Sequence, residues 1–348
     1  MKKLLLLMLV SSSIAWGAYW SSVSKSDLHL HLGGAYPLDY LLSIANDEQQ
    51  QTLLTHLRDM QNGVDYTDCF ARFNIISEIV NDEQKVEEGT YRLCRQMAEE
   101  TVTYAEIRTG AYDFGRGAES YVQSVLKGIE RATSDSFQAR LILSVRRYSS
   151  IETACKTIDL AIAYKDRGVI GIDLSGDTMQ GDVRTILPEL IRAKTHGLSL
   201  FIHMGEAMGE LDQELLLDTL HPTRIGHGIH LTDKALAYVI KYRIPVEVCM
   251  TSSRLTRMQS ANASHPWIER YRKEGHPIFL CSDDPLLFSS TLSQEYQKAE
   301  EMGFFSREEL EQIAAASVDP DTVVPHRCLD CDPSLKTTPA SHSNPLTF

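Results

Sequence analysis

Eight short apolar runs alternate with longer helical patterns along this 348-residue chain. This alternation is typical of βα units that build a parallel sheet. One α/β barrel of roughly 250 or more residues fits the length as well as two average domains do. We therefore predict an α/β fold, a closed (β/α)8 TIM barrel. Its strands are expected at residues 27–31, 102–107, 140–145, 169–174, 199–203, 224–227, 245–249 and 278–282.

Helical patterns fill the gaps between these runs. One pattern between Val183 and Ile191 places apolar residues at i, i+3, i+4, i+7 and i+8, which predicts one apolar helix face. Ser306 and Glu309 form a capping box ahead of another predicted helix. The gap of residues 36–100 is long enough for more than one helix. We therefore expect extra helices inserted after strand 1.

Polar motifs follow several of the predicted strands. They are His29-Leu30-His31, His203-Met204-Gly205-Glu206, Gly226-His227-Gly228 and Ser282-Asp283-Asp284-Pro285. A barrel brings the carboxyl ends of its strands to one mouth, so these motifs are expected to meet. Each motif alone is weak, because a chance His-x-His is expected about 0.4 times at this histidine content. Their order along the chain carries the information.

In this order the motifs resemble those of the adenosine deaminase family of zinc hydrolases. The similarity covers nearly everything from about Lys25 to Ser317, and the run from Ser290 to Tyr296 is similar to the nucleoside-acting branch. The matching segments are Asp27 to Leu32, Tyr104 to Arg108, Gly171 to Asp177, His203 to Glu206, Arg224 to Gly228 and Asp283 to Phe288. The resemblance implies that the inserted helices help to cover the pocket.

The resemblance also implies a site for one Zn²⁺ per chain. Its ligands would be His29, His31, His203 and Asp283. Three imidazoles and a carboxylate suit zinc in a site that keeps one position open for water, whose pKa would fall to near 7. A second metal is not expected, because the fourth strand ends Ile172-Asp173-Leu174 without a bridging lysine.

Further roles are carried over from the family by position. Glu206 would protonate the purine ring nitrogen beside the attacked carbon, and His227 would orient and deprotonate the water. Asp284 would hydrogen-bond the opposite ring nitrogen, and the amide of Gly176 would meet the purine edge, where a side chain would obstruct contact. His31 is expected to contact substrate as well as metal.

The sequence departs from the family at Gly33. Family members usually carry Asp, Glu or Asn here, and in adenosine-specific enzymes the Asp contacts the ribose 5′-hydroxyl. We therefore expect hydrolytic deamination of adenosine, or of a close 5′-modified adenosine, to inosine and ammonia. Two alternatives stay open at this point. They are an adenine or 5′-modified adenosine deaminase, and a non-catalytic secreted barrel that binds purines or acts in signalling.

The chain contains seven cysteines. Five lie singly in predicted helices or strands, as small buried thiols usually do. Cys328 and Cys331 mimic the second half of another deaminase motif, but no His-x-Glu accompanies them. A structural metal is not expected there either, because zinc wants four ligands. Residues 319–348 show no periodicity, and we expect a flexible C-terminal tail.

The N-terminal segment of the chain predicts where the protein is located. Lys2 and Lys3 precede the apolar run Leu4 to Val10 and then small residues, which predicts a signal peptide over residues 1–17 and an exported protein. The alternative is a start at Met8 and a cytoplasmic protein. The apolar run is too short for a stable membrane span. The barrel is expected over residues 18–318.

The net charge of the chain bears on its partners. A formal net charge of −13 argues against a nucleic-acid polymer as partner, so a small purine nucleoside is the expected ligand.

Overall fold

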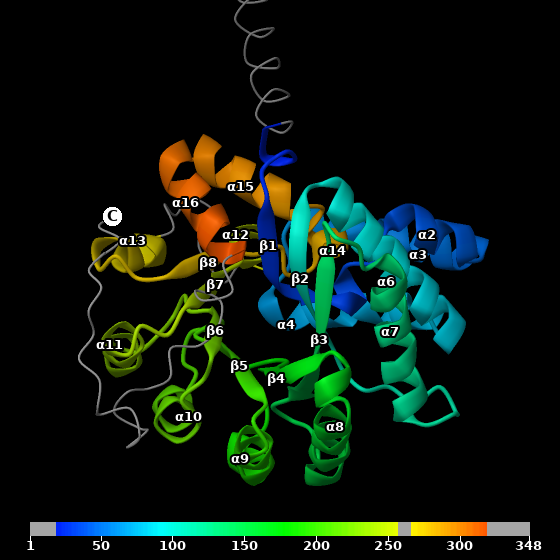
Figure 1. Ribbon diagram of the computed structural model, residues 1–348, viewed down its shortest axis with the longest axis horizontal. Helices are drawn as coiled ribbons and strands as arrows, with labels where there is room; N and C mark the ends of the chain where they lie inside the picture. The colour runs from blue at the N-terminus through cyan, green and yellow to red at the C-terminus, as the bar shows by residue number, and fades with distance from the viewer. Residues whose placement is uncertain (1–18, 257–265, 319–348) are drawn as a thin grey trace, which may run out of the picture.

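The computed structural model describes residues 19–256 and 266–318, and it contains the predicted barrel (Figure 1). Eight parallel strands lie side by side in chain order. All eight predicted strands are therefore confirmed. Their bounds are β1 Lys25–His31, β2 Val102–Thr109, β3 Gln138–Arg146, β4 Val169–Ser175, β5 Ser199–Met204, β6 Arg224–His227, β7 Val246–Val248 and β8 Ile278–Leu280.

The first and last strands meet just beyond the end of β8. Leu30 and Asp283 form a parallel bridge. The amide of His31 donates to the carbonyl of Asp283 at 2.8 Å, and the amide of Asp283 donates to the carbonyl of His29 at 2.9 Å. These backbone contacts close the barrel, and they use residues that were predicted as metal ligands.

Outer helices surround the sheet (Figure 1). They bury the outer faces of strands that are apolar on both sides, such as the fully buried run Leu141 to Leu143 in β3. An outer ring of helices is the usual consequence of βα connections in a closed barrel. These helices are α7 Ala118–Ala132, α8 Ile151–Ala163, α9 Leu187–Thr195, α10 Gln213–Leu220, α11 Asp233–Lys241, α13 Pro266–Lys273, α15 Leu292–Glu301 and α16 Arg307–Val318.

The helix prediction around residue 187 was wrong in part. The stretch divides into a 3-10 turn at Val183–Thr185 and the helix α9. Pro188 lies in the first turn of α9, where its missing N–H costs nothing, so this position favours a helix start. Val183 is buried as expected, whereas Ile191 is 42% exposed. The capping box is confirmed, since Ser306 and Glu309 exchange hydrogen bonds of 2.7 and 3.2 Å.

The predicted insertion after β1 consists of several helices. They are α2 Leu38–Ile44, α3 Asp47–Gln61, α4 Tyr66–Cys69, α5 Phe73–Ile79 and α6 Glu83–Glu99, and we call α2 to α5 the inserted helices. A small apolar cluster joins them to the short helices α12 Met250–Leu255 and α14 Pro285–Phe288; its buried members are Met60, Val64, Cys69, Leu255 and Phe288. The amide of Val64 also donates to the carbonyl of Leu255 at 2.9 Å. The insertion is thereby attached to the strand ends of the barrel.

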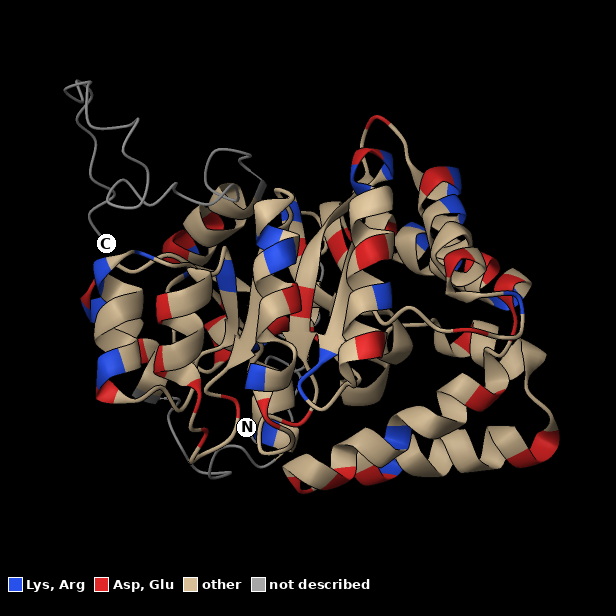
Figure 2. Cartoon of the chain, turned by 90° about the horizontal axis from the view of Figure 1, so that it is seen from below, with Lys and Arg blue, Asp and Glu red and all other residues tan. Residues whose placement is uncertain are grey.

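The surface charges and five of the seven cysteines lie within the described residues. Acidic and basic residues are interspersed along the outer helices (Figure 2). Within residues 19–256 and 266–318, no helix has the length and apolar character needed to cross a bilayer. The five cysteines in these ranges are free, and all but Cys155 are buried. Cys328, Cys331, the predicted signal peptide and the predicted tail lie outside the described residues.

Candidate active site

A cavity of about 470 Å³ opens at the carboxyl ends of the strands. This is within the usual size of small-molecule sites. Side chains from α4, α5 and the turn between them form part of its wall, so the inserted helices cover the mouth. Seven of the predicted site residues line it, namely His31, Gly33, Gly176, His203, Glu206, Asp283 and Asp284. His29 and His227 lie deeper and are fully buried.

Three histidine rings converge at the base of this cavity. His29 and His31 extend from the same face of β1, and His203 comes from β5. The Nε2 atom of His31 lies 3.2 Å from that of His29 and 3.0 Å from that of His203. An Asp283 carboxylate oxygen lies 3.6 Å from the Nε2 atoms of both His29 and His31.

This donor set fits a metal ion. Ligand nitrogens around a tetrahedral zinc lie about 3.3 Å apart, close to the observed separations. Burial lowers the pKa of His29, and it lowers the pKa of His31 to about 3, so both rings are neutral and able to ligate. Three ring nitrogens facing one another at this distance cannot all find hydrogen-bond partners among themselves. The residues present therefore suit a cation at their centre.

Carboxylates behind the rings fix the orientation of two histidines. His29 Nδ1 lies 2.8 Å from Glu247, and His203 Nδ1 lies 3.0 Å from Asp173. Burial lowers the pKa of His203 and the Asp173 carboxylate raises it, with a net upward shift. A carboxylate on Nδ1 directs Nε2 of the same ring into the cavity, which is the usual arrangement behind metal-ligating histidines.

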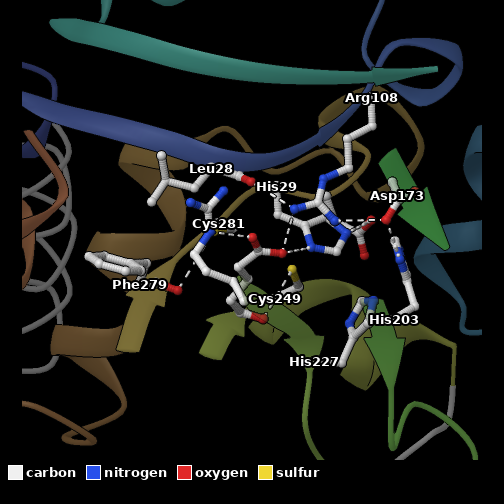
Figure 3. Close-up of polar contacts among 12 residues, drawn as sticks. Leu28, His29, Arg108, Asp173, His203, His227, Cys249, Phe279 and Cys281 are labelled. Carbon is white, nitrogen blue, oxygen red and sulfur yellow. Dashed lines mark hydrogen bonds and ion pairs between the residues drawn. The ribbon is translucent and has the colours of Figure 1, made fainter. Parts of the chain in front are cut away.

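Two buried arginines connect these carboxylates, and one of them, Arg108, is labelled beside Asp173 and His29 in Figure 3. Arg108 donates to Asp173 at 3.1 Å, to Glu247 at 2.5 Å and to the carbonyl of Leu28 at 2.9 Å. Arg224 pairs with Glu247 at 2.7 Å and with Glu106. We call Glu106, Arg108, Asp173, Arg224 and Glu247 the interior charge network. Asp173 is engaged by His203, Arg108 and Ser144, so it is not free to bridge a second metal ion.

Glu206 and His227 face each other beside the three rings. Their carboxylate oxygen and Nε2 atom are 3.6 Å apart. Burial raises the pKa of Glu206 to about 7, an effect that the His203 charge partly offsets, so the carboxyl group is partly protonated near neutral pH. Burial also lowers the pKa of His227, and neither of its ring nitrogens has a hydrogen-bond partner in the described part of the chain. The pair therefore combines a proton donor with a neutral base.

Glu206 has one partner that the sequence did not predict. Tyr66, in the inserted helix α4, donates its hydroxyl to Glu206 at 3.0 Å. The amide of Thr178, in the loop after β4, donates to the Tyr66 hydroxyl at 3.2 Å. Tyr66 thus connects the inserted helices to the barrel at the predicted acid. Its separation of 140 residues from Glu206 left no sequence signal.

Asp283 and Asp284 place two carboxyl groups next to each other. Asp283 has a positive φ of 64°, a strained conformation for this residue type. Burial and the neighbouring Asp283 raise the pKa of Asp284, and its Oδ1 atom has no hydrogen-bond partner among the described residues. A Cβ at Gly34 would lie 1.9 Å from that oxygen. Only glycine fits at position 34, a constraint that the sequence did not reveal.

The two glycines predicted to contact substrate differ in their surroundings. A Cβ at Gly33 would meet only Phe73, at 3.7 Å, so this position has room for a side chain. Gly176 has a φ of 83°, and a Cβ there would lie 3.0 Å from the ring of Tyr148 and 3.3 Å from Arg146. Gly176 therefore needs to be glycine for backbone and packing reasons, whereas Gly33 does not.

Several site residues were missed although the sequence held a signal for some of them. Asp173, Glu247 and Arg108 are charged residues inside apolar strands, and such residues are rarely buried without partners. That pattern could have predicted an interior network. Gly226 was predicted only as part of the Gly226-His227-Gly228 motif, without a role of its own. A Cβ there would lie 2.8 Å from the ring of His29, so this glycine lets the ring pack closely.

Comparison with known proteins gives a consistent result. Residues 24–324 match the family model described as adenosine deaminase. The N6-mAMP deaminase of Arabidopsis thaliana is 31% identical over 86% of this chain and 92% of its own length. The adenine deaminase of Rhizobium leguminosarum bv. trifolii is 27% identical over 86% and 96%. The crystal structure of arabidopsis ADAL complexed with IMP superposes with a TM-score of 0.76 at 29% identity, covering 85% of this chain and 91% of that one.

Proposed function

This chain belongs to the adenosine deaminase family and is a deaminase of adenosine-like substrates, and from this premise we propose a specific reaction. The protein removes the 6-amino or 6-methylamino group of a purine nucleoside that is substituted at its 5′ position. Water adds to C6, the bond from C6 to the exocyclic nitrogen breaks, and ammonia or methylamine leaves. The observation that carries the proposal is the facing pair Glu206 and His227 beside three converging histidines.

Zinc is the proposed cofactor, at one ion per chain. His29, His31, His203 and Asp283 would hold it, since their donor atoms converge as described above. When bound, the metal supplies the Lewis acidity that makes water nucleophilic near neutral pH. The carboxylates of Glu247 and Asp173 keep two of the rings in the tautomer that presents Nε2 to the ion.

Glu206 and His227 handle the protons of the reaction. Glu206 protonates the ring nitrogen next to C6 as water adds, which removes negative charge from the ring. Its raised pKa keeps that proton available near pH 7. His227 accepts a proton from the attacking water, and its lowered pKa keeps the ring neutral beforehand. Positioned acid–base groups of this kind contribute about 10²–10⁴-fold to a rate.

Asp284 and Gly176 orient the purine. Burial and the neighbouring Asp283 raise the pKa of Asp284, which favours the protonated carboxyl, and its Oδ1 atom has no partner among the described residues; we therefore assign Asp284 to the ring nitrogen on the side opposite Glu206. The amide of Gly176 meets the other edge of the ring. Gly33 contributes no side chain to the sugar, and this favours a substrate other than plain adenosine.

Two substrates stand out from the relatives. N6-methyl-AMP is the first candidate, because the Arabidopsis relative named for it is 31% identical over most of both chains. Adenine is the second candidate, because the Rhizobium relative named as an adenine deaminase aligns over 96% of its length. Adenosine, the compound after which the family is named, is a third candidate.

A substrate panel tests the proposal. Purified protein with one equivalent of zinc would be given adenosine, adenine, 5′-deoxyadenosine, AMP and N6-methyl-AMP, while ammonia and methylamine are measured. We expect release from at least one substrate that carries a 5′ substituent. Turnover of adenine alone would replace the proposal with the second candidate. Binding of purines without release from any of them would favour the non-catalytic alternative.

We also propose that residues 1–17 direct export and that the mature chain starts near Ala18. The support is the order of charged, apolar and small residues. The intact mass of protein recovered from its native compartment tests this. A mass that includes Met1 would contradict export, and a mass that begins at Met8 would support the alternative start.

A further inference from the structure

The rim of the cavity carries an arginine without a carboxylate partner. Arg146 is the last residue of β3 and lines the cavity. Within residues 19–256 and 266–318 no carboxylate lies within ion-pair distance of it, and its Nη2 donates instead to the hydroxyl of Tyr112 at 3.3 Å. Arg108, the other arginine of this lining, is held by Asp173 and Glu247. Arg146 is therefore the cation that this cavity offers to a ligand.

Two phenol groups surround Arg146 at the rim. Tyr112 follows β2 and Tyr148 follows β3, and each side chain is 42% exposed. Both line the same cavity, and both interact electrostatically with the Arg146 guanidinium. We call Arg146, Tyr112 and Tyr148 the rim cluster. A planar guanidinium with neighbouring hydroxyls presents several N–H and O–H donors, which matches the acceptor oxygens of a phosphate group.

The rim cluster lies where the sugar end of a purine nucleoside would point. The candidate metal ligands come from β1, β5 and the end of β8, whereas the cluster follows β2 and β3, which lie between β1 and β5 in the ring of strands. Gly176 lies between them, within 3.3 Å of Arg146 and Tyr148 when a Cβ is built on it. A purine with C6 at the metal ligands and its edge at Gly176 therefore extends its ribose toward the rim cluster.

The charge at position 33 is consistent with this arrangement. The adenosine-specific pattern would place an Asp at this position, which would repel an anion. Gly33 carries no charge and leaves open space, with Phe73 at 3.7 Å as the nearest neighbour of a built Cβ. The cavity lining thus has no carboxylate at position 33, and it includes the Arg146 guanidinium, which pairs with no described carboxylate.

We propose that the rim cluster is an anion subsite that binds the 5′-phosphate of a purine nucleoside monophosphate, with Arg146 as its main specificity residue. The inference rests on the proposed deamination and adds to it the residues that choose between nucleotide and nucleoside. Because the cluster is partly exposed, the phosphate remains partly hydrated. The interaction therefore weakens as ionic strength rises.

Paired substrates test the subsite. N6-methyl-AMP and N6-methyladenosine share every group except the phosphate, as AMP and adenosine do. We expect Arg146→Met to lower kcat/KM by about 10–100-fold for the nucleotide of the active pair, the scale of a lost charge-assisted hydrogen bond. The corresponding nucleoside should change by less than about threefold, because an exposed charge acts weakly on a neutral ligand. Calorimetry with IMP should show a parallel loss of affinity, which is a readout independent of turnover.

Matched variants separate local binding from overall charge. Arg116→Met removes the same charge from the exposed loop after β2, at a position that does not line the cavity, and should leave both substrates unaffected. Arg146→Lys should retain part of the nucleotide preference. Gly33→Asp should lower nucleotide turnover by about tenfold and change nucleoside turnover less.

The outcomes distinguish the subsite from the reaction itself. Equal loss on nucleotide and nucleoside in Arg146→Met, or a wild-type enzyme without preference for the phosphate, would overturn the subsite while the deamination stands. A nucleotide preference that Arg116→Met reduces as much as Arg146→Met does would show overall charge rather than a subsite. A protein that deaminates no purine but binds IMP through Arg146 would refute the reaction and keep the subsite.

Discussion

The interior charge network and the cavity wall differ in whether their charged groups are ion-paired, although Nε of Arg108 in the network has no hydrogen-bond partner among the described residues. In the network, Glu106, Asp173 and Glu247 are each paired with Arg108 or Arg224. At the cavity, both nitrogens of His227 and one oxygen of Asp284 have no hydrogen-bond partner among the described residues, and Arg146 has no carboxylate. Both regions lie within one barrel, so the fold alone does not explain the difference.

The difference separates groups that hold positions from groups that meet a ligand. A buried polar group without a partner costs stability, so it persists where a ligand or solvent supplies the missing contact. The paired charges orient the rings that we propose as metal ligands, and the unpaired groups are those to which we assign contact with substrate. Variants in the two regions should therefore fail in different ways.

The largest loss of activity is expected at His203, which contacts both the cavity and the interior charge network. His203→Ala should lose bound zinc and all measurable activity while the metal-free protein still folds, because His203 lies at a strand end. Metal analysis and thermal unfolding of metal-free wild type and variant would check this. Full zinc occupancy in the variant would remove His203 from the ligand set. A large fall in the midpoint of thermal unfolding would instead show that His203 has a structural role like that of the interior charge network.

A cavity variant should lose rate without losing metal. Glu206→Gln is expected to keep zinc and substrate binding and to lower kcat by about 10²–10⁴-fold, the usual scale for a positioned proton donor. Steady-state kinetics and zinc content give both readouts. An unchanged kcat would reduce Glu206 to a structural residue, and loss of zinc would place it among the metal ligands.

A network variant should lose metal affinity and stability together. Asp173→Asn keeps the size of the side chain but removes the charge that pairs with Arg108 and His203. We expect zinc affinity to fall about 10–100-fold, as for other partners of metal-ligating histidines, and the free energy of unfolding to fall as well. Chelator competition and denaturant titration measure the two effects. Normal zinc affinity with lower stability would separate the network from the metal site.

Most of the fold and many of the candidate site residues were predictable from the sequence, whereas some of their contacts were not. Strand periodicity and motif order predicted all eight strands, and the structure brings His29, His31, His203, Glu206, His227 and Asp283 together as expected. The alternation of apolar and helical segments and the spacing of residues within a motif depend on residues that are close in the chain, so they can be read from the sequence. Tyr66 and Gly34 were missed because their importance comes from contacts with Glu206 and Asp284, which are distant in the chain. The helix at residue 187 failed because Pro188 sets its start.

The smallest effect is expected at the contact between the inserted helices and the barrel. Tyr66→Phe removes the hydrogen bond to Glu206 but keeps the ring. We expect kcat to fall about 3–10-fold with little change in zinc content, since one hydrogen bond to a charged or acidic group is involved. Comparison with Glu206→Gln and with the double variant measures the coupling. Additive losses in the double variant would show that Tyr66 does not act through Glu206.

The backbone contact between Leu30 and Asp283 also has a consequence for how this protein folds. It joins segments about 250 residues apart, so its loop-closure entropy must be met after most local structure has formed. A growing chain can complete β1 to β7 without a working site, because the carboxylate that faces His29 and His31 arrives only with the final strand. If the proposed metal ion is held by both ends, it would favour the closed state by mass action. Deaminase activity would consequently require that the end of β8 has joined β1.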